Sequence, residues 1–177
     1  VVMHMKTMNI FLKNFAVGLG VLLANAASAQ GDGNSSENNF ILDREDSTKY
    51  ALILAGPTVG DENKSQFRQW AFSLHDILAR DYGYSSDTIS LLYDRGEVEG
   101  AGSQRIDAAC DLEGSQQELA RLQSVVQPGD QITIYLIGHG SGAEEESKFN
   151  IVGPDITGGQ FADILDVFDQ QDMIIVN

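Results

Sequence analysis

The sequence predicts an α/β fold, in which helices cover both faces of a mostly parallel sheet to make a three-layer αβα sandwich. From Tyr50 onward, short apolar runs alternate with longer segments of helical period, which is the pattern of strands joined by crossover helices. The apolar runs are nearly continuous rather than alternating, which indicates strands that are buried on both faces. With 177 residues, the chain has room for one globular domain.

Four strands and a first helix can be placed in order. The helix is expected over residues 65–81, because apolar residues recur there at spacings of three and four, and Gly83 is expected to end it. Each strand is an apolar run bounded by glycine, proline or polar residues. The four strands are expected at residues 50–55, 88–93, 131–137 and 173–176.

Two further helices carry possible start signals. Ser115 and Glu118 have the spacing of a capping box for a helix that Pro128-Gly129 ends. Thr157 and Gln160 have the same spacing before the next apolar stripe. The fourth strand has no helix after it that would cover its sheet face, so we expect the domain, residues 49–177, to be C-terminally incomplete.

The first 29 residues are predicted to be a signal peptide. Lys6 and Lys13 give a positive start, residues 15–24 form a short apolar run, and Ala27-Ser28-Ala29 has the small-x-small pattern of a cleavage site. Ten apolar residues span roughly 15 Å as a helix, about half of a bilayer core, so no stable membrane anchor is expected after cleavage. Residues 30–48 are polar and glycine-rich and are predicted to be a flexible linker. The mature domain is expected to be periplasmic or secreted.

Charge and cysteine content exclude several classes of protein. The formal net charge is −15, with 11 Lys and Arg against 26 Asp and Glu, so nucleic acid is not an expected partner. One cysteine cannot form an internal disulfide, and three histidines without further cysteines do not make a structural zinc site. We predict neither a metal nor another cofactor.

The loop after the third strand carries the clearest chemical signal. Gly138-His139-Gly140-Ser141-Gly142 follows the strand directly, and the carboxyl ends of parallel strands are where such sheets bind ligands. An imidazole at this edge can accept or donate a proton near neutral pH, while the flanking glycines allow a ligand to approach the backbone. We therefore take His139 as a candidate catalytic residue.

The strand ITIYLIGHGS, followed by KFNIVGPDITGGQFADIL and the strand DMIIVN, resembles the caspase-hemoglobinase fold of the clan CD cysteine peptidases, nearest to the legumain-like group. The resemblance extends back through TISLLYDRG to YALILAG and covers about residues 50–177. It implies that His139 is the catalytic imidazole and that the backbone N–H of Gly140 contributes to an oxyanion hole. It also implies substrate binding by Thr58, Gly138 and Ser141, with a peptide or protein as the substrate.

The sequence departs from the family's pattern at three points. The nucleophilic cysteine of the family would fall a few residues beyond Asn177, and Cys110, which precedes the histidine strand, is expected to be a partly buried loop cysteine. Thr58 stands where legumain-like enzymes place an asparagine that orients the imidazole. Arg68 is only near the position of their substrate-reading arginine, so no substrate preference is carried over.

Two function classes stay open from the sequence. One is an exported cysteine endopeptidase whose thiol follows Asn177, and the other is a catalytically inactive caspase-like module that binds a peptide or protein. A serine hydrolase is disfavoured because no Gly-x-Ser-x-Gly elbow occurs. A phosphate loop at residues 56–65 is disfavoured because Asp61-Glu62-Asn63 stand where a lysine is needed. His75 is expected to be a surface or boundary residue of the first helix.

Overall fold

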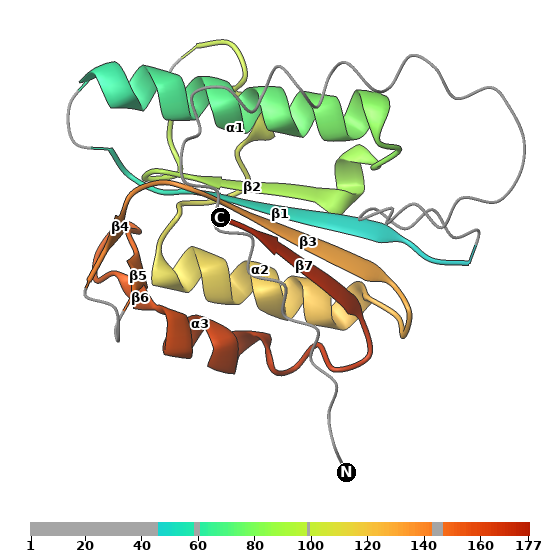
Figure 1. Ribbon diagram of the computed structural model, residues 1–177. Coiled ribbons are helices and arrows are strands. Elements are labelled where there is room, and N and C mark those ends of the chain that lie inside the picture. The colour runs from blue at the N-terminus through green and yellow to red at the C-terminus, as the bar shows by residue number, and fades with distance from the viewer. Residues whose placement is uncertain (1–45, 59–60, 99, 143–146) are drawn as a thin grey trace, which may run out of the picture. The chain divides into compact units, whose positions relative to one another are not determined.

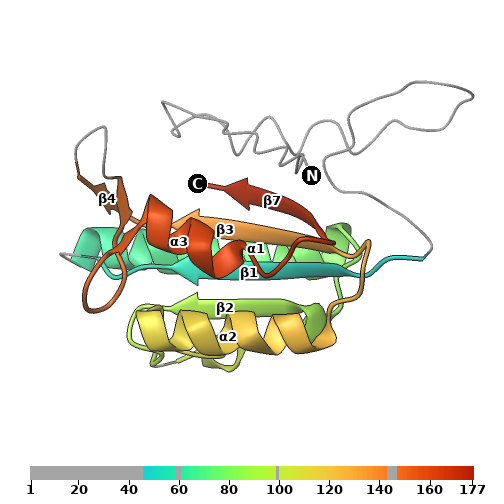
Figure 2. The same ribbon diagram turned by 90° about the horizontal axis from the view of Figure 1, so that it is seen from below.

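The computed structural model describes residues 46–58, 61–98, 100–142 and 147–177, with side chains from Lys64 onward in the first helix. Its centre is a parallel sheet of four strands in the order β2-β1-β3-β7, and their arrowheads point the same way in Figure 2. The strands are β1 (Lys49–Ala55), β2 (Ile89–Tyr93), β3 (Gln131–Ile137) and β7 (Asp172–Val176). All four predicted strands are therefore confirmed to within one residue at each end.

Helices cover both faces of this sheet. Helix α1 (Asp61–Asp81) lies on one face, and α2 (Leu112–Val125) and α3 (Gly158–Leu165) lie on the other (Figure 1). The arrangement of layers is that of an αβα sandwich, so the predicted α/β class with a mostly parallel sheet is confirmed. The predicted signal peptide, nearly all of the predicted linker and residues 143–146 lie outside the described residues.

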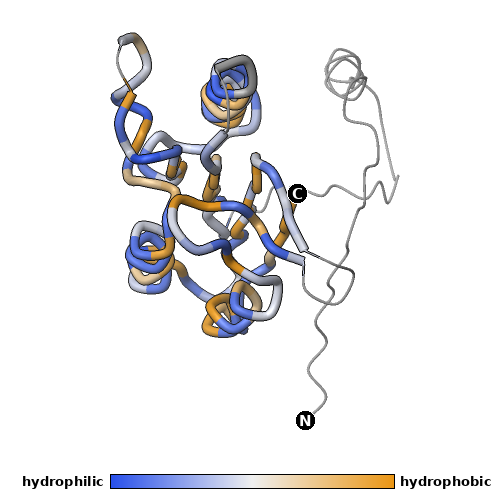
Figure 3. Tube along the Cα trace, turned by 90° about the vertical axis from the view of Figure 1, so that its left-hand side faces the viewer, coloured by the Kyte–Doolittle hydropathy of each residue, from blue (hydrophilic) through white to orange (hydrophobic). Residues whose placement is uncertain are grey.

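Two apolar cores hold the layers together, and β1 contributes to both. Leu52 and Leu54 pack with α2 and α3, whereas Ala51, Ile53 and Ala55 pack with α1. Successive side chains of a strand point to opposite faces, so a continuous apolar run is what a central strand between two helical layers needs. In Figure 3 the helices are viewed nearly end-on, and each carries both hydrophobic and hydrophilic residues.

Helix α1 begins four residues earlier than the apolar periodicity predicts. Its first turn is polar, so the sequence pattern becomes visible only at Phe67. It ends as expected, because Gly83 has φ +69° and the Tyr84 N–H donates to the Leu78 carbonyl at 3.2 Å. Both features belong to a glycine-terminated helix end.

The predicted capping box at the start of α2 is wrong. Asp111 is the N-cap, and its Oδ1 accepts a hydrogen bond from the Gly114 N–H at 2.7 Å. Ser115 lies inside the helix, where its Oγ donates to the Asp111 carbonyl at 2.6 Å, and Glu118 accepts from Ser90 Oγ at 2.6 Å. Aspartate accepts at an N-cap as well as serine does, so the two candidates could not be ranked by residue type.

The capping box predicted for α3 is confirmed. Thr157 Oγ1 accepts from the Gln160 N–H at 3.1 Å, and Gln160 Oε1 accepts from the Thr157 N–H at 2.9 Å. Leu165 and Phe168 follow as buried core residues on the α2 and α3 face of the sheet. Within the described part of the chain, no helix is both long enough and apolar enough to cross a membrane.

A second, antiparallel sheet lies at the carboxyl ends of the main strands and was not expected from the sequence. It consists of β4 (Gly140–Ser141), β5 (Lys148–Phe149) and β6 (Ile156–Thr157), in the order β4-β5-β6. Figures 1 and 2 show it beside the arrowheads of the parallel strands. Since β4 starts directly after His139, this small sheet helps to define the candidate site.

Candidate active site at the carboxyl edge of the sheet

The strand order creates a switch point between β1 and β3. The chain leaves β1 towards β2 on one side, and β3 and β7 lie on the other side. Ligands of open parallel sheets bind where the winding reverses in this way, outside the carboxyl ends of the strands. The Gly56 N–H donates to the Ile137 carbonyl at 2.9 Å, so the loops after β1 and β3 start side by side at this point.

Two glycines let three segments meet at the switch point. A Cβ on Gly56 would overlap the carbonyl oxygen of Asn150, and a Cβ on Gly138 would lie 2.9 Å from the ring of Phe149. Real Cβ atoms do not approach a backbone oxygen so closely, which makes glycine the residue that fits at position 56. The segment that follows β5 is therefore packed against the ends of both central strands.

His139 is exposed, and it is held from two directions. Its carbonyl oxygen accepts a hydrogen bond from the Asn150 N–H at 3.0 Å. Its ring lies 5.3 Å from the ring of Phe67, centroid to centroid, with 46° between the planes. Phe67 comes from α1, is only 7% exposed, and stacks on Trp70 at 5.7 Å. The imidazole thus lies against an aromatic wall and is still exposed to solvent.

The other predicted site residues occupy different parts of this edge. Gly140 and Ser141 form β4 and are exposed, and Ser141 Oγ donates to Asp155 Oδ2 at 3.2 Å. Thr58, in the loop after β1, has a buried Oγ1 without a hydrogen-bond partner among the described residues. No hydrogen bond joins Thr58 Oγ1 to His139 in the described part of the chain, so an orienting role for Thr58, whose position the resemblance compares with an orienting asparagine, stays a prediction.

The pairing of β4 with β5 determines the direction of the Gly140 N–H. Antiparallel pairs alternate between hydrogen-bonded and non-hydrogen-bonded. The bond between Asn150 and His139 makes Gly140–Phe149 a non-hydrogen-bonded pair, because these are the next two residues in the register. The Gly140 N–H therefore points away from β5.

Cys110 cannot serve as a nucleophile at this edge. It is fully buried, packs in the core with Leu92, and lies in the loop before α2. Burial raises the pKa of its thiol to about 12, and the negative charges of Asp111 and Asp94 act in the same direction. A reactive cysteine needs the opposite environment, since the thiolate is the attacking species. The predicted loop position of Cys110 is confirmed, but its burial is complete rather than partial.

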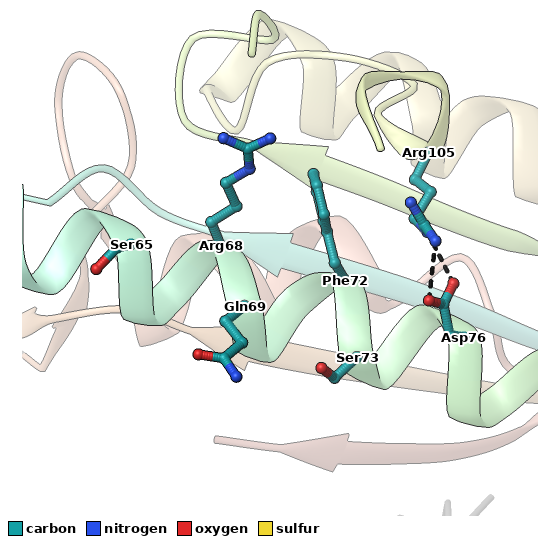
Figure 4. Close-up of a pocket in the computed structure, with 7 residues that line it drawn as sticks. All are labelled: Ser65, Arg68, Gln69, Phe72, Ser73, Asp76 and Arg105. Carbon is teal, nitrogen blue, oxygen red and sulfur yellow. Dashed lines mark hydrogen bonds and ion pairs between the residues drawn. The ribbon is translucent and has the colours of Figure 1, made fainter. Parts of the chain in front are cut away.

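Arg68 lines a pocket that does not include His139. The pocket is an open depression along α1 that Arg105 and Asp76 close at one end by paired hydrogen bonds of 2.7 and 2.9 Å (Figure 4). The guanidinium groups of Arg68 and Arg105 both lie over the ring of Phe72, at 5.3 and 5.5 Å. Arg68 also donates to the Ala101 carbonyl at 3.1 Å. These contacts fix the loop after β2 onto the helix.

His75 lies further along α1 and is a boundary residue, as expected. Its side chain is 16% exposed, and its Nδ1 is 3.5 Å from Asp76 Oδ1. It has no part in the switch point. Among the described residues, no group of three or more His, Cys, Asp or Glu could hold a metal ion.

Two residues of the site were not singled out from the sequence, namely Phe67 and Asn150. In the sequence, Phe67 is one of several apolar residues at helical spacing, and nothing in that pattern indicates its contact with His139. Asn150 follows a strand of two residues, which is too short to give a periodic signal. No model of a known protein family matches this sequence, and no curated protein matches it.

Proposed function

We propose that the chain is an exported cysteine endopeptidase domain of the caspase and legumain type, in which His139 is the catalytic imidazole. The observation that carries this proposal is the position of His139, at the carboxyl end of β3 and beside the end of β1, where the strand order β2-β1-β3-β7 reverses. A peptide bound across this edge presents its carbonyl to the imidazole. The substrate is a peptide or protein, and nucleic acid is disfavoured by the charge of −15.

In this reaction His139 is the general base and then the general acid. It accepts the proton of a thiol nucleophile and later donates a proton to the amine leaving group. The Gly140 N–H, which points away from β5, is an oxyanion donor for the carbonyl oxygen that becomes negatively charged. Gly138, Ser141 and Thr58 line the approach of the substrate.

The thiol is proposed to come from residues that follow Asn177 in the gene product. Strand β7 runs parallel to β3 and pairs with it from Gln131↔Asp172 to Tyr135↔Val176. A cysteine shortly after β7 would therefore reach the same edge of the sheet as His139. Cys110 does not meet this need, because its thiol is buried and protonated.

The alternative is a catalytically inactive module that binds a peptide or protein at the same edge. The observation that favours it is the absence of a reactive thiol from the described residues, where Cys110 is the only cysteine. The codons after Asn177 separate the two candidates. A cysteine there supports the peptidase, whereas serine, threonine or alanine supports the binding module.

Peptide hydrolysis tests the proposal directly. The chain as printed should hydrolyse no peptide above background, because it has an imidazole and an oxyanion donor without an attacking group. In the gene product extended beyond Asn177, His139→Ala should lower kcat by roughly 10²–10⁴-fold, while His75→Ala should leave kcat nearly unchanged. Equal losses in the two variants, or hydrolysis by the printed chain that His139→Ala abolishes, would contradict the proposal.

A further inference from the structure

Asn150 is the cross-strand neighbour of His139. The register of the β4–β5 hairpin pairs Gly140 with Phe149, so the next pair outward is His139 with Asn150. The hydrogen bond from the Asn150 N–H to the His139 carbonyl, at 3.0 Å, continues the ladder to this pair. Residues that face each other in an antiparallel pair have Cβ atoms about 4.5–5.5 Å apart on the same face. The carboxamide and the imidazole are thus within reach of each other.

The neighbours of Asn150 indicate the side to which its carboxamide points. Phe149 and Ile151 both pack into the core on the α2 and α3 face of the sheet. In an extended segment, the residue between them points the other way. The segment is paired on both sides of Asn150, at Phe149 with β4 and at Val152 with Asp111. Its side chain therefore points towards α1, and the His139 ring meets Phe67 of α1 on that same side.

The carboxamide also has an unused acceptor. Asn150 Oδ1 is buried and has no hydrogen-bond partner among the described residues. A buried acceptor without a donor costs about 1–3 kcal/mol, so such an atom usually has a partner in the working state. The His139 ring contacts the Phe67 ring, and a neutral imidazole always carries one N–H that can donate a hydrogen bond.

We propose that Asn150 is the positioning residue of His139, with its Oδ1 accepting the imidazole N–H. This bond selects one tautomer and leaves the lone pair of the other ring nitrogen facing the open edge, where a proton can be accepted. Phe67 supports the face of the same ring. The catalytic consequence rests on the proposed function, but the bond itself does not.

Thr58 is the competing residue for this role. Its Oγ1 is also buried and unpaired, and by resemblance it stands at the position of an orienting side chain. Asn150 differs from Thr58 in having both a backbone hydrogen bond to His139 and a paired position opposite it. The two assignments can be separated by experiment, because each residue can be replaced without changing the other.

The test is the tautomer of His139, read from the ¹⁵N shifts of its imidazole in the chain as printed. The wild type should show one dominant neutral tautomer, and Asn150→Leu should give a mixture of both. Asn150→Asp, which keeps an acceptor at the same place, should restore the single tautomer, and Thr58→Val should leave it unchanged. His75 is an internal control, since its shifts should be the same in all variants.

Three outcomes would overturn the assignment. These are an unchanged His139 tautomer in Asn150→Leu, no restoration in Asn150→Asp, or a mixture in Thr58→Val. A variant that unfolds would also change the shifts of His75, so loss of structure is recognised separately. Because the measurement needs no catalysis, it can fail while the peptidase proposal stands. In an active gene product, Asn150→Leu should lower kcat about tenfold or more with little change in KM.

Discussion

Replacement of Gly56 by alanine should disturb both the stability of the domain and the candidate site. The added Cβ would overlap the carbonyl oxygen of Asn150, which is backbone and cannot rotate away as a side chain could. Relief requires the segment after β5 or the start of the loop after β1 to move. Movement of the loop strains the hydrogen bond of 2.9 Å from the Gly56 N–H to the Ile137 carbonyl, and movement of the segment strains the bond of 3.0 Å from the Asn150 N–H to the His139 carbonyl.

The expected loss can be estimated from these two contacts. Inserting a methyl group into a packed site costs about 1–3 kcal/mol, and a lost backbone hydrogen bond costs about 1 kcal/mol more. Gly56→Ala should therefore lower the free energy of unfolding by roughly 2–4 kcal/mol, out of the ~5–15 kcal/mol typical of a domain. Gly159→Ala is the matched control, because a Cβ there meets nothing closer than 4.0 Å. It replaces an exposed glycine of α3 and should be neutral or stabilising by about 0.5 kcal/mol.

Urea denaturation followed by fluorescence measures both variants. The single tryptophan, Trp70, stacks on Phe67 and so reports the helix that contacts His139. Gly56→Ala should shift the midpoint to lower urea without changing the slope, whereas Gly159→Ala should not. If the two variants have the same free energy of unfolding, the close packing of Asn150 against Gly56 is not a feature of the protein in solution.

Three further predictions concern other parts of the molecule. Cys110 should resist a thiol reagent at pH 8 in the native protein and react after unfolding, because with a pKa of about 12 only roughly one molecule in 10⁴ carries the thiolate. Stoichiometric labelling of the native protein at the rate of a free thiol would contradict the burial of Cys110. Asp111→Ala should destabilise the protein by about 1 kcal/mol through loss of the α2 N-cap, and Asp111→Asn should recover most of this, as thermal or urea unfolding can show. Burial is the largest cause that raises the pKa of Asp107, so the folded state holds its proton more tightly, and its contribution to stability falls as pH rises above ~4. Asp107→Asn keeps an acceptor for the Leu91 N–H but no longer titrates. When the pH is raised from 4 to 6, the free energy of unfolding should therefore change in a more positive direction in Asp107→Asn than in the wild type. The same pH dependence in both proteins would refute this.

The parallel sheet could be predicted from the sequence because its strands are buried on both faces. The runs at β1 and β3 consist mostly of apolar residues, as strands that are covered on both faces require. The helix ends were less well determined, since Asp111 and Ser115 are both good caps and only the backbone geometry chooses between them. The two-residue strands β4, β5 and β6 carry no periodic signal, because alternation needs more residues to be visible.

In the candidate site, too, some residues could be predicted from the sequence and others could not. His139 could be found because it follows a predicted strand directly and has glycines on both sides. Its neighbours could not, because Phe67 reaches it across a long stretch of sequence, and Asn150 reaches it through a hairpin whose strands are too short to give a pattern. Phe67 is indistinguishable in sequence from the other core residues of α1. The sequence thus indicated His139 as a site residue but not Phe67 and Asn150, which contact it.

The central claim is that His139 assists a thiol that follows β7, and covalent labelling of the complete gene product tests it most directly. The protein is treated with a peptide-based thiol-reactive electrophile at neutral pH, and the modified residue is identified by mass spectrometry. We expect one label on a cysteine shortly after Asn177, no label on Cys110, and a strong decrease in labelling rate in His139→Ala but not in His75→Ala. A gene product without a cysteine there, or with labelling that His139→Ala does not slow, would contradict the claim.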